Sequence, residues 1–242
     1  MKAIVCTKYG PPDVLQLKEV DKPTPKDNEA LVKVRAASLN ATDFEYLRGV
    51  FIARLVYKGL LKPKNTILGT DIAGQVEAVG RNVTQFQPDD EIWGDLSVCG
   101  FGAFAEYVCV PENVLRLKPA SMTFEEAAAI PTAAVLALHN LCDKRPIQPG
   151  QKVLINGAGG SVGTFAVQLA RYFGAEVTGV DSMEKLDMLR SIGADHVIDY
   201  TQEDFTRSGQ HYDLILDVVA HRSFFDYKRA LSPKGNCCLC RS

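Results

Sequence analysis

The sequence predicts an α/β protein with two domains, and three observations lead to this prediction. Short strand-like segments separated by turn residues fill the chain up to about Pro119. Beyond this point short apolar segments alternate with longer helical ones, as they do in proteins with parallel sheets. The first of these apolar segments runs into a cluster of glycines that opens a helix. We therefore expect a strand-rich domain over residues 1–119 and a doubly wound parallel sheet over residues 120–242.

The strands of the first domain are predicted from short apolar runs. Residues 30–36 alternate apolar with mostly charged side chains, which is the pattern of a strand with one solvated face. Further apolar runs, separated by turn-forming Gly, Pro and Asp residues, lie at residues 2–7, 72–79, 91–94 and 105–110. Many short strands of this kind predict a barrel or a sandwich.

The second domain is predicted to begin with a helix and to continue with repeated strand-helix units. Ser121 has the side chain of a helix N-cap, and Glu125 and Glu126 follow where the helix dipole favours acidic residues. Strands are expected at residues 152–156, 176–181, 196–198 and 213–218, and helices at 162–173, 184–192 and around 224–231. Residues 236–240 supply at most a fifth strand.

Composition and charge exclude several classes of protein. Apolar residues make up 46% of the 242 residues and charged residues 23%, which is ordinary for a folded soluble protein. Lys and Arg number 27 against 29 Asp and Glu, which predicts no nucleic-acid partner and no membrane partner. The longest apolar stretch, residues 127–138, is interrupted by Pro131 and Thr132 and is shorter than the roughly 20 residues of a membrane span.

The N-terminus and the cysteines predict a cytoplasmic protein. The first residues include Lys2 and Lys8 and lack the apolar core of a signal peptide. The seven cysteines are odd in number and form no C-x-x-C pair. Both features are typical of reduced thiols in a cytoplasm.

The glycine cluster is the strongest local signal in the chain. The strand at residues 152–156 leads into Gly157, Gly160 and Gly163, and a helix follows. Glycines let a pyrophosphate approach the backbone closely, and the amides at the start of the helix bind its charge. A plain tight loop is the alternative, but the flanking strand and helix, with an acidic residue roughly 20 positions on, favour a dinucleotide site.

That acidic residue, Asp181, bears on the choice of cofactor. A carboxylate at the end of the second strand accepts hydrogen bonds from ribose hydroxyls and repels a 2′-phosphate, which favours NAD. Ser182 and Lys185 lie just beyond it and are able to bind a phosphate. Alternatively, Ser182 caps the next helix and Lys185 is merely solvated. The expected cofactor is therefore NAD(P)H.

The chain as a whole resembles the medium-chain dehydrogenase/reductase superfamily and, within it, the zinc-independent quinone reductase-like branch, often named NAD(P)-dependent alcohol dehydrogenase. Besides the glycine loop, the motifs that carry the resemblance are residues 10–15 (GPPDVL), 40–43 (NATD), 69–74 (GTDIAG), 102–107 (GAFAEY), 129–133 (AIPTA) and 193–200 (GADHVIDY). The resemblance implies a GroES-like β-barrel catalytic domain, a Rossmann domain, and hydride transfer in the cleft between them.

The resemblance also implies a protein without zinc. Zinc-dependent relatives place a cysteine where this chain has Asn40, a histidine where it has Thr70, and a cysteine near Thr132. None of the three residues present is an adequate zinc ligand. Hydride is then expected to pass to a quinone or an activated enone, a small apolar carbonyl compound, with the proton coming from water or a nearby hydroxyl.

Specific residues follow from the resemblance. Asn40 is expected to hold the nicotinamide or the substrate, Asp43 to order the site, and Tyr46 to offer a hydroxyl. Alternatively, Asn40 or Asp43 caps a helix over residues 44–48, and Tyr46 only packs. The residues expected to bind the cofactor are Thr132, Asn156, Gly157, Gly159, Gly160, Ser161, Val162, Gly163, Asp181, Ser182, Lys185, Tyr200 and Val219.

Several other features carry weaker expectations. Asp217, at the end of the fourth strand, is expected to order the loop that follows, where Ala220 stands in place of the family's usual glycine. The histidines, including His221, are expected to be structural. Residues 50–61 are apolar and are expected to line a substrate pocket or form a lid, or else to make a subunit contact or a minor core.

Two alternative functions remain beside the quinone or enone reductase. One is a zinc-free alcohol or aldehyde oxidoreductase, and the other is a non-catalytic protein that binds the cofactor. The chain is expected to be C-terminally truncated, because the Rossmann sheet would end early in a cysteine-rich tail and the returning segment of the catalytic domain is missing. Family members form homo-oligomers, but the strand that usually pairs their subunits is expected to be absent.

Overall fold

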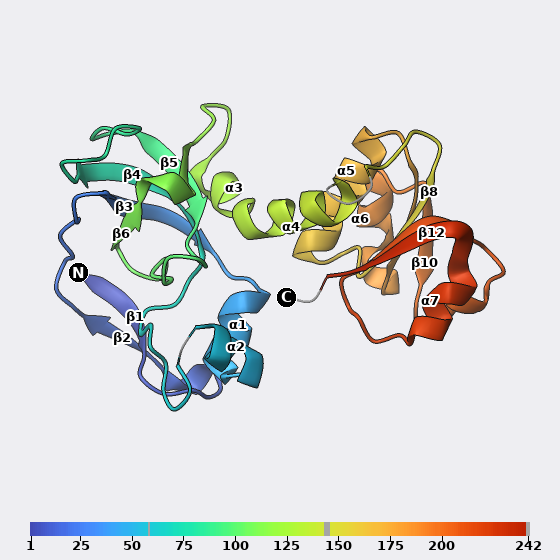
Figure 1. Ribbon diagram of the computed structural model, residues 1–242, viewed down its shortest axis with the longest axis horizontal. Helices are drawn as coiled ribbons and strands as arrows, with labels where there is room; N and C mark the ends of the chain where they lie inside the picture. Colours follow the sequence, from blue (N-terminus) through green and yellow to red (C-terminus); the bar gives the residue numbers. More distant parts are fainter. Residues whose placement is uncertain (58, 143–145, 241–242) are drawn as a thin grey trace. The chain divides into compact units, whose positions relative to one another are not determined.

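The computed structural model describes residues 1–57, 59–142 and 146–240, which divide into two compact units, Met1–Thr132 and Ala133–Ser242 (Figure 1). Lys58, in the predicted apolar segment, and the tail residues 241–242 lie outside the described residues. The first unit extends beyond Pro119 because the helix α3 (Phe124–Ala128) packs on its sheet through Ala127, Ala128 and Phe124.

The first unit is built on a five-stranded antiparallel sheet with the order β6-β3-β4-β5-β7. The strands are β3 (Glu29–Ser38), β4 (Asp71–Val79), β5 (Glu91–Asp95), β6 (Tyr107–Pro111) and β7 (Leu115–Leu117). A second, two-stranded antiparallel sheet pairs β1 (Lys2–Cys6) with β2 (Leu15–Glu19). Each strand predicted for this domain is confirmed, whereas β2 and β7 were not predicted. Val32, Ile72, Val76 and Ile92 form the centre of the core because alternate side chains of these strands face the same way.

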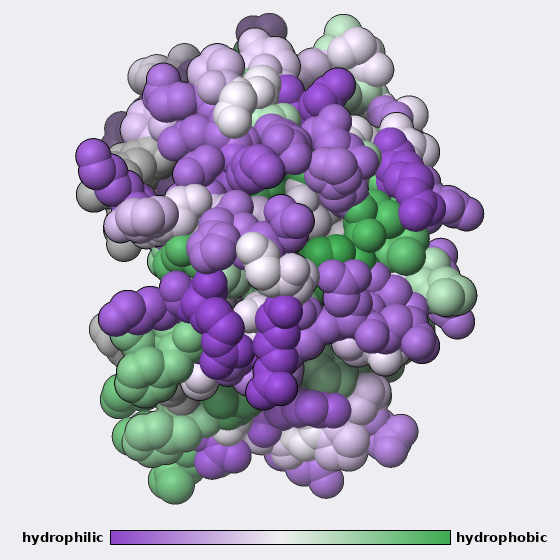
Figure 2. Space-filling view, turned by 90° about the vertical axis from the view of Figure 1, so that its right-hand side faces the viewer, coloured by the Kyte–Doolittle hydropathy of each residue, from purple (hydrophilic) through white to green (hydrophobic). Residues whose placement is uncertain are grey.

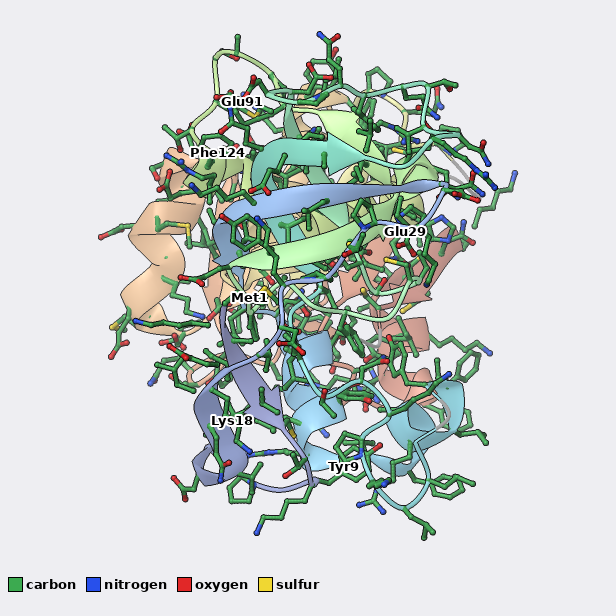
Figure 3. All side chains as sticks on the ribbon, turned by 90° about the vertical axis from the view of Figure 1, so that its left-hand side faces the viewer. Met1, Tyr9, Lys18, Glu29, Glu91 and Phe124 are labelled. Carbon is green, nitrogen blue, oxygen red and sulfur yellow. The ribbon has the colours of Figure 1, made fainter. Side chains whose placement is uncertain are left out.

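Short helices complete the first unit, namely α1 (Ala41–Arg48), α2 (Phe51–Val56) and the 3₁₀ turns η1 (Pro12–Val14) and η2 (Glu112–Val114). The predicted N-cap Ser121 is wrong. Thr123 caps α3, because its hydroxyl accepts from the Glu126 amide while the Glu126 carboxylate accepts from the Thr123 amide. Lys118 joins this region to the sheet, since its ammonium lies 3.0 Å from Glu91 and over the ring of Phe124. Glu91 and Phe124 are labelled in Figure 3.

The second unit contains a five-stranded parallel sheet with the order β10-β9-β8-β11-β12. The strands are β8 (Lys152–Asn156), β9 (Glu176–Asp181), β10 (His196–Asp199), β11 (Tyr212–Asp217) and β12 (Leu231–Leu239). Numbered along the chain from β8, this is the order 3-2-1-4-5 of a dinucleotide-binding sheet, as predicted. The predicted fifth strand is present, because residues 236–239 pair in parallel with β11.

Helices cover both faces of this sheet. The residues of α4 (Pro131–Cys142) from Ala133 onward, α5 (Ser161–Tyr172) and α6 (Leu186–Ser191) share one core cluster. The turn η4 (Phe205–Arg207) and α7 (Phe224–Ala230) share a second cluster on the other face; the 3₁₀ turn η3 (Met183–Lys185) precedes α6. Because β9 and β11 flank β8 on opposite sides, the carboxyl ends of β8 and β11 mark the switch point where such sheets bind ligands.

The surface of the protein agrees with its average composition. Hydrophilic residues predominate on the face drawn in Figure 2, and hydrophobic residues form patches among them. No helix in the part of the chain that the structure describes has the length and apolar character of a membrane span.

Candidate functional site

The turn between β8 and α5 shows why glycine is needed in this loop. Gly157 follows the strand with φ +81°, a left-handed conformation that glycine adopts without strain. A Cβ on Gly163 would lie 2.2 Å from the Gly157 carbonyl oxygen and 2.6 Å from Ala158 Cα. Only glycine at position 163 therefore allows α5 to pack this closely on the turn.

The start of α5 is able to receive an anion. Gly160 is its N-cap and supplies no side chain to bond the first amides of this twelve-residue helix. A Cβ built on Gly160 would meet only the Gly157 carbonyl oxygen, at 3.4 Å, so the space in front of this residue is open. The loop is thus a cradle that a side chain would fill and that a pyrophosphate fits.

Asp181, at the end of β9, is bonded to this loop. Its Oδ2 accepts from the Gly159 amide at 2.7 Å, and its Oδ1 accepts from the Ser182 amide at 2.9 Å. The ammonium of Lys185 lies 3.4 Å from Oδ1. Ser182 is the N-cap of η3 but makes no side-chain capping bond, and Lys185 is engaged with Asp181 rather than merely solvated.

A pocket of about 670 Å³ opens beside the loop. The predicted cofactor residues that line it are Asn156, Gly157, Gly160, Asp181, Lys185, Tyr200 and Val219. The predicted residues of this unit that do not line it are Gly159, Ser161, Val162, Gly163 and Ser182. Among these, Gly159 and Ser182 donate their amides to Asp181. Gly163 allows α5 to pack closely on the turn.

Asp217, at the end of β11, orders the loop that follows this strand, as predicted. It is fully buried, and its Oδ1 accepts from the amides of Val219 (2.8 Å) and Ala220 (2.6 Å). Its Oδ2 accepts from Asn156 Nδ2 (3.0 Å) and from the Tyr227 hydroxyl (2.6 Å). Burial and this bond to Asp217 raise the pKa of Tyr227. The carboxylate thereby joins the end of β8 to the loop after β11.

Four residues that line this pocket were not predicted to bind the cofactor, namely Val180, Val218 and the two polar residues His221 and Arg222. His221 and Arg222 follow β11 and line the pocket, although His221 was expected to be structural and Arg222 was not considered. Their position could have revealed them, because loops after central strands of a parallel sheet surround the ligand. Neither residue belongs to a recognisable motif, so no signal based on spacing was available.

In the first unit, Asp71 is the centre of a polar cluster. It is 1% exposed, and its Oδ1 accepts from the amide (3.1 Å) and hydroxyl (2.7 Å) of Thr132. Its Oδ2 accepts from the Ser38 hydroxyl (3.0 Å) and from Asn40 Nδ2 (3.1 Å). Burial raises the pKa of Asp71. Sequence reasoning missed this residue, because its partners come from distant parts of the chain. The contact of Thr132 with a cofactor stays a prediction.

Asn40 and Asp43 form the N-terminal capping box of α1. Asn40 Oδ1 accepts from the Thr42 amide at 2.9 Å, and Asp43 Oδ2 accepts from the Asn40 amide at 3.1 Å. Asn40 Nδ2 donates to both the Thr70 hydroxyl (2.6 Å) and Asp71. The helix-capping alternative is therefore confirmed for Asn40, although the helix begins at Ala41 rather than at Phe44, and Asp43 contributes from inside the helix, at its third position. Their catalytic and ordering roles stay predictions.

Asp43 is held in a desolvated environment. It is 2% exposed, and its Oδ1 accepts from the Gly69 amide at 3.1 Å. Burial raises the pKa of Asp43 to about 6, while the amides of Asn40 and Gly69 oppose this shift by bonding the charged form. Asp43 thus ties the start of α1 to the segment before β4.

Tyr46 is a core residue. It is fully buried, and its ring packs against Tyr9, Tyr57 and Phe101. Its hydroxyl accepts from the Asn65 amide at 2.9 Å. The Tyr9 ring, labelled in Figure 3, lies 5.9 Å from the Tyr46 ring. The structure supports the packing alternative for Tyr46 and does not bring its hydroxyl into the Asp71 cluster.

At the positions where zinc-dependent relatives carry their zinc ligands, the side chains of this chain form hydrogen bonds with one another and with Asp71. Asn40 donates to Thr70, and both Asn40 and Thr132 donate to Asp71. Among residues 1–57, 59–142 and 146–240, no group of three or more His, Cys, Asp and Glu side chains is arranged to hold a metal ion.

The predicted apolar segment 50–61 forms α2 and the loop after it. Several of its side chains are exposed, including Phe51 (72%), Leu55 (60%) and Leu61 (97%). Residues 59–64 line a pocket of about 620 Å³ with Thr7 and Thr66. The side chains available on this surface are mainly apolar, although Lys62 and Lys64 border the pocket.

Comparison with known proteins identifies the family. Residues 26–120 match the alcohol dehydrogenase GroES-like domain, and residues 161–240 match the family described as zinc-binding dehydrogenase. A 2-methylene-furan-3-one reductase of Solanum lycopersicum is 39% identical over 228 residues, which cover 90% of this chain and 57% of that protein. A chloroplastic quinone-oxidoreductase homolog of Spinacia oleracea is 35% identical over 97% of this chain and 73% of its own length.

Solved structures agree. The quinone oxidoreductase from Coxiella burnetii has a TM-score of 0.87 and 31% identity, covering 98% of this chain and 74% of that one. The chain thus spans less than two thirds of the tomato reductase and about three quarters of the Coxiella protein. The glycine loop, the strand order and these matches together show that the chain belongs to the medium-chain dehydrogenase/reductase superfamily, in its quinone oxidoreductase-like branch.

Proposed function

We propose that this chain is an NAD(P)H-dependent oxidoreductase that transfers hydride to a quinone or an activated enone without zinc. The observation that carries the proposal is the pocket at the carboxyl ends of β8, β9 and β11, where the glycine loop meets Asp181. Quinone and enone reductases among its relatives support the same class of reaction.

The residues of the second unit fit a dinucleotide. The open space at Gly160 and the uncapped start of α5 would receive the pyrophosphate, and Asp181, Lys185 and Tyr200 would surround the adenine-side ribose. When bound, the nicotinamide supplies the hydride, so the protein has to bind, orient and shield rather than to form a covalent intermediate. Asp217 contributes by holding Asn156 and the Val219 amide in place.

The polar cluster of the first unit supports the zinc-free form of the proposal. Thr70 and Thr132 are hydroxyl residues held by Asn40 and Asp71, and the side chains present there suit hydrogen bonding rather than metal ligation. The exposed apolar side chains of α2 and the loop that follows suit an apolar acceptor better than a sugar or an amino acid.

Enzyme assays test the proposal directly. We expect the purified chain to oxidise NADPH or NADH when a quinone or an α,β-unsaturated ketone is added, at a rate that a metal chelator leaves unchanged. Metal analysis should find less than one zinc per chain. Stoichiometric zinc, together with activity that the chelator abolishes, would overturn the zinc-free form of the proposal.

A non-catalytic cofactor-binding protein is the second candidate, and Ala220 favours it. This residue has φ +56°, a left-handed conformation that is strained for alanine, in the loop that lines the pocket. Saturable binding of NAD(P)H without oxidation by any quinone, enone, aldehyde or ketone would support this candidate. Oxidation only with simple aldehydes, or reduction of NAD(P) by alcohols, would instead indicate the zinc-free alcohol or aldehyde oxidoreductase.

A further inference from the structure

The cofactor pocket has more positive charge at its walls than the glycine loop requires. Lys185, from η3, and Arg222, from the loop after β11, both line it. Asp181 is the one carboxylate among the described residues that line it. A ribose with two neutral hydroxyls needs hydrogen-bond acceptors at this place, whereas a phosphate needs donors and positive charge.

Asp181 is poorly placed to select the unphosphorylated ribose. Each of its oxygens already accepts from a backbone amide, of Gly159 or Ser182. The Lys185 ammonium, 3.4 Å from Oδ1, offsets its charge. The repulsion that a free carboxylate would exert on a phosphate is therefore weakened within this unit.

Arg222 is held in place before any ligand binds. Its Nη1 donates to Asp204 Oδ2 at 3.0 Å, and its guanidinium lies over the ring of Phe205 at 5.5 Å. Asp204 is fixed in turn, because its Oδ1 accepts from the amide (3.0 Å) and the hydroxyl (2.8 Å) of Thr206. The Arg222 side chain is therefore largely ordered before a ligand binds, so binding costs less conformational entropy.

Two carboxylates, Asp204 and Asp226, interact electrostatically with Arg222, and each of them also pairs with a second arginine. Asp204 is shared with Arg207, whose Nε lies 3.8 Å from the same oxygen that accepts from Arg222. Two guanidinium groups therefore share the carboxylate of Asp204. Burial raises the pKa of Asp204, but the hydrogen bonds from Thr206 and the charge and hydrogen bond of Arg222 outweigh burial and lower it. A guanidinium has five N–H donors, and the bond to Asp204 uses one of them.

We propose that Arg222 is a phosphate-binding residue of this pocket and that it selects NADPH over NADH by binding the phosphate on the adenine-side ribose. The proposal rests on the proposed function, since it assigns a specificity residue to the same dinucleotide pocket. A guanidinium matches a phosphate with two parallel donors, which a lysine cannot do. Arg222 and Lys185 would thereby both supply positive charge to the pocket that Asp181 also lines.

Binding measurements separate the phosphate from the rest of the cofactor. We would titrate the full chain by calorimetry with NADPH, NADH, adenosine 2′,5′-bisphosphate and 5′-AMP. Arg222→Gln is expected to raise the Kd of NADPH and of the bisphosphate about 10- to 100-fold, the range for hydrogen bonds to a charged group. The Kd of NADH and of 5′-AMP should change by less than about twofold. Arg222→Lys, which keeps the charge without the planar fork, should give an intermediate loss.

Arg207→Gln is the matched control, because Arg207 shares Asp204 but has a 75% exposed side chain and does not line the pocket. All four ligands should bind this variant as they bind the wild type. The proposal for Arg222 is overturned if Arg222→Gln weakens NADH and 5′-AMP as much as NADPH, or if it changes none of them while thermal unfolding shows a folded variant. Wild-type protein that binds neither dinucleotide overturns the proposed function itself, and with it this proposal.

Discussion

The buried carboxylates of the two units accept hydrogen bonds from different kinds of donor. In the second unit, the Asp217 Oδ1 accepts from amides only two and three residues further along the chain, and Asp181 accepts from the next amide. In the first unit, Asp71 accepts from side chains 33 and 61 residues away. The first arrangement shapes a local loop with backbone amides, while Asp217 Oδ2 and Asp181 Oδ2 tie that loop to Asn156 and Gly159, 61 and 22 residues away. The second joins strand, helix and loop segments that the sequence separates widely.

The difference has an energetic consequence. Burial raises the pKa values of both Asp43 and Asp71, so the first unit carries two carboxylates whose charged forms are disfavoured. Their hydrogen bonds offset part of this cost. We expect changes in this cluster to act mainly on stability and changes around the glycine loop to act mainly on cofactor binding.

The largest effect is expected at the loop. In Gly163→Ala, the new Cβ would lie 2.2 Å from the Gly157 carbonyl oxygen. We expect a loss of about 3 kcal/mol in the free energy of unfolding, because the contact is with backbone that cannot move cheaply. Cofactor binding should be lost as well. Urea denaturation and calorimetric titration measure the two effects.

Gly160→Ala is the matched control, because its Cβ would meet only one atom, at 3.4 Å. We expect its free energy of unfolding to stay within about 0.5 kcal/mol of the wild type, since nothing is displaced. Its cofactor affinity should still fall, because the methyl group enters the cradle. A Gly160→Ala variant that binds the cofactor as tightly as the wild type would contradict this placement of the pyrophosphate.

The next effect concerns pH and belongs to the first unit. The pKa of Asp43 is about 6 in the folded protein and near 3.8 without burial. The folded state therefore holds this proton more tightly, and stability is highest below about pH 4 as far as this group is concerned. Rising pH should remove up to about 3 kcal/mol between pH 4 and 6, with little further change from this group above that range.

Asp43→Asn removes the titrating group and serves as the reference for this prediction. We expect the difference in unfolding free energy between the wild type and this variant to depend on pH between about pH 4 and 6, and to be flat above pH 7. Asp71 and Asp95 raise the pKa of Asp43 electrostatically, so the difference reports Asp43 together with its coupling to these two carboxylates. A difference that is constant from pH 4 to 7 would show that Asp43 is already ionised at pH 4 in the folded protein.

A smaller effect is expected for Asp71→Asn. The amide offers one oxygen to donors that now use two, so at least two of the groups of Thr132, Ser38 and Asn40 lose their acceptor. We expect a loss of about 2 kcal/mol in the free energy of unfolding. Ser38→Ala removes only one donor and should cost about 1 kcal/mol. Equal losses in the two variants, measured by urea denaturation, would mean that the cluster does not act through Asp71.

The smallest effect has the opposite sign. Ala220 has φ +56°, so Ala220→Gly should relieve strain and stabilise the second unit by about 0.5–1 kcal/mol after the entropy of glycine is subtracted. Ala41→Gly, at an exposed helical position in the first unit, should destabilise by a few tenths to about 1 kcal/mol. Thermal unfolding compares the two. A destabilised Ala220→Gly variant would show that the loop does not hold this conformation.

The local sequence pattern was sufficient to predict much of the structure of the second unit. The strand before Gly157, the helix after Gly163 and the acid at Asp181 lie within one strand-helix-strand unit, so their spacing predicts the turn, the sheet and the cofactor class. Asn40 was recognisable as a helix cap for the same reason, because a capping box is formed by residues three positions apart. The sequence did not show whether Tyr46 is a catalytic residue or a core residue, because it does not reveal whether a single tyrosine is buried or exposed.

The sequence by itself therefore determined the fold class, the glycine loop and the family, because these depend on periodicity and on glycines a few residues apart. Only the tertiary structure decided that Asp71 accepts hydrogen bonds from Ser38, Asn40 and Thr132, and that Asp204 and Phe205 hold Arg222 at the pocket beside the glycine loop. These contacts join segments that lie far apart along the chain. Hydrogen bonds and ion pairs act over a few ångströms, so such groups interact only once the sheets have brought them together.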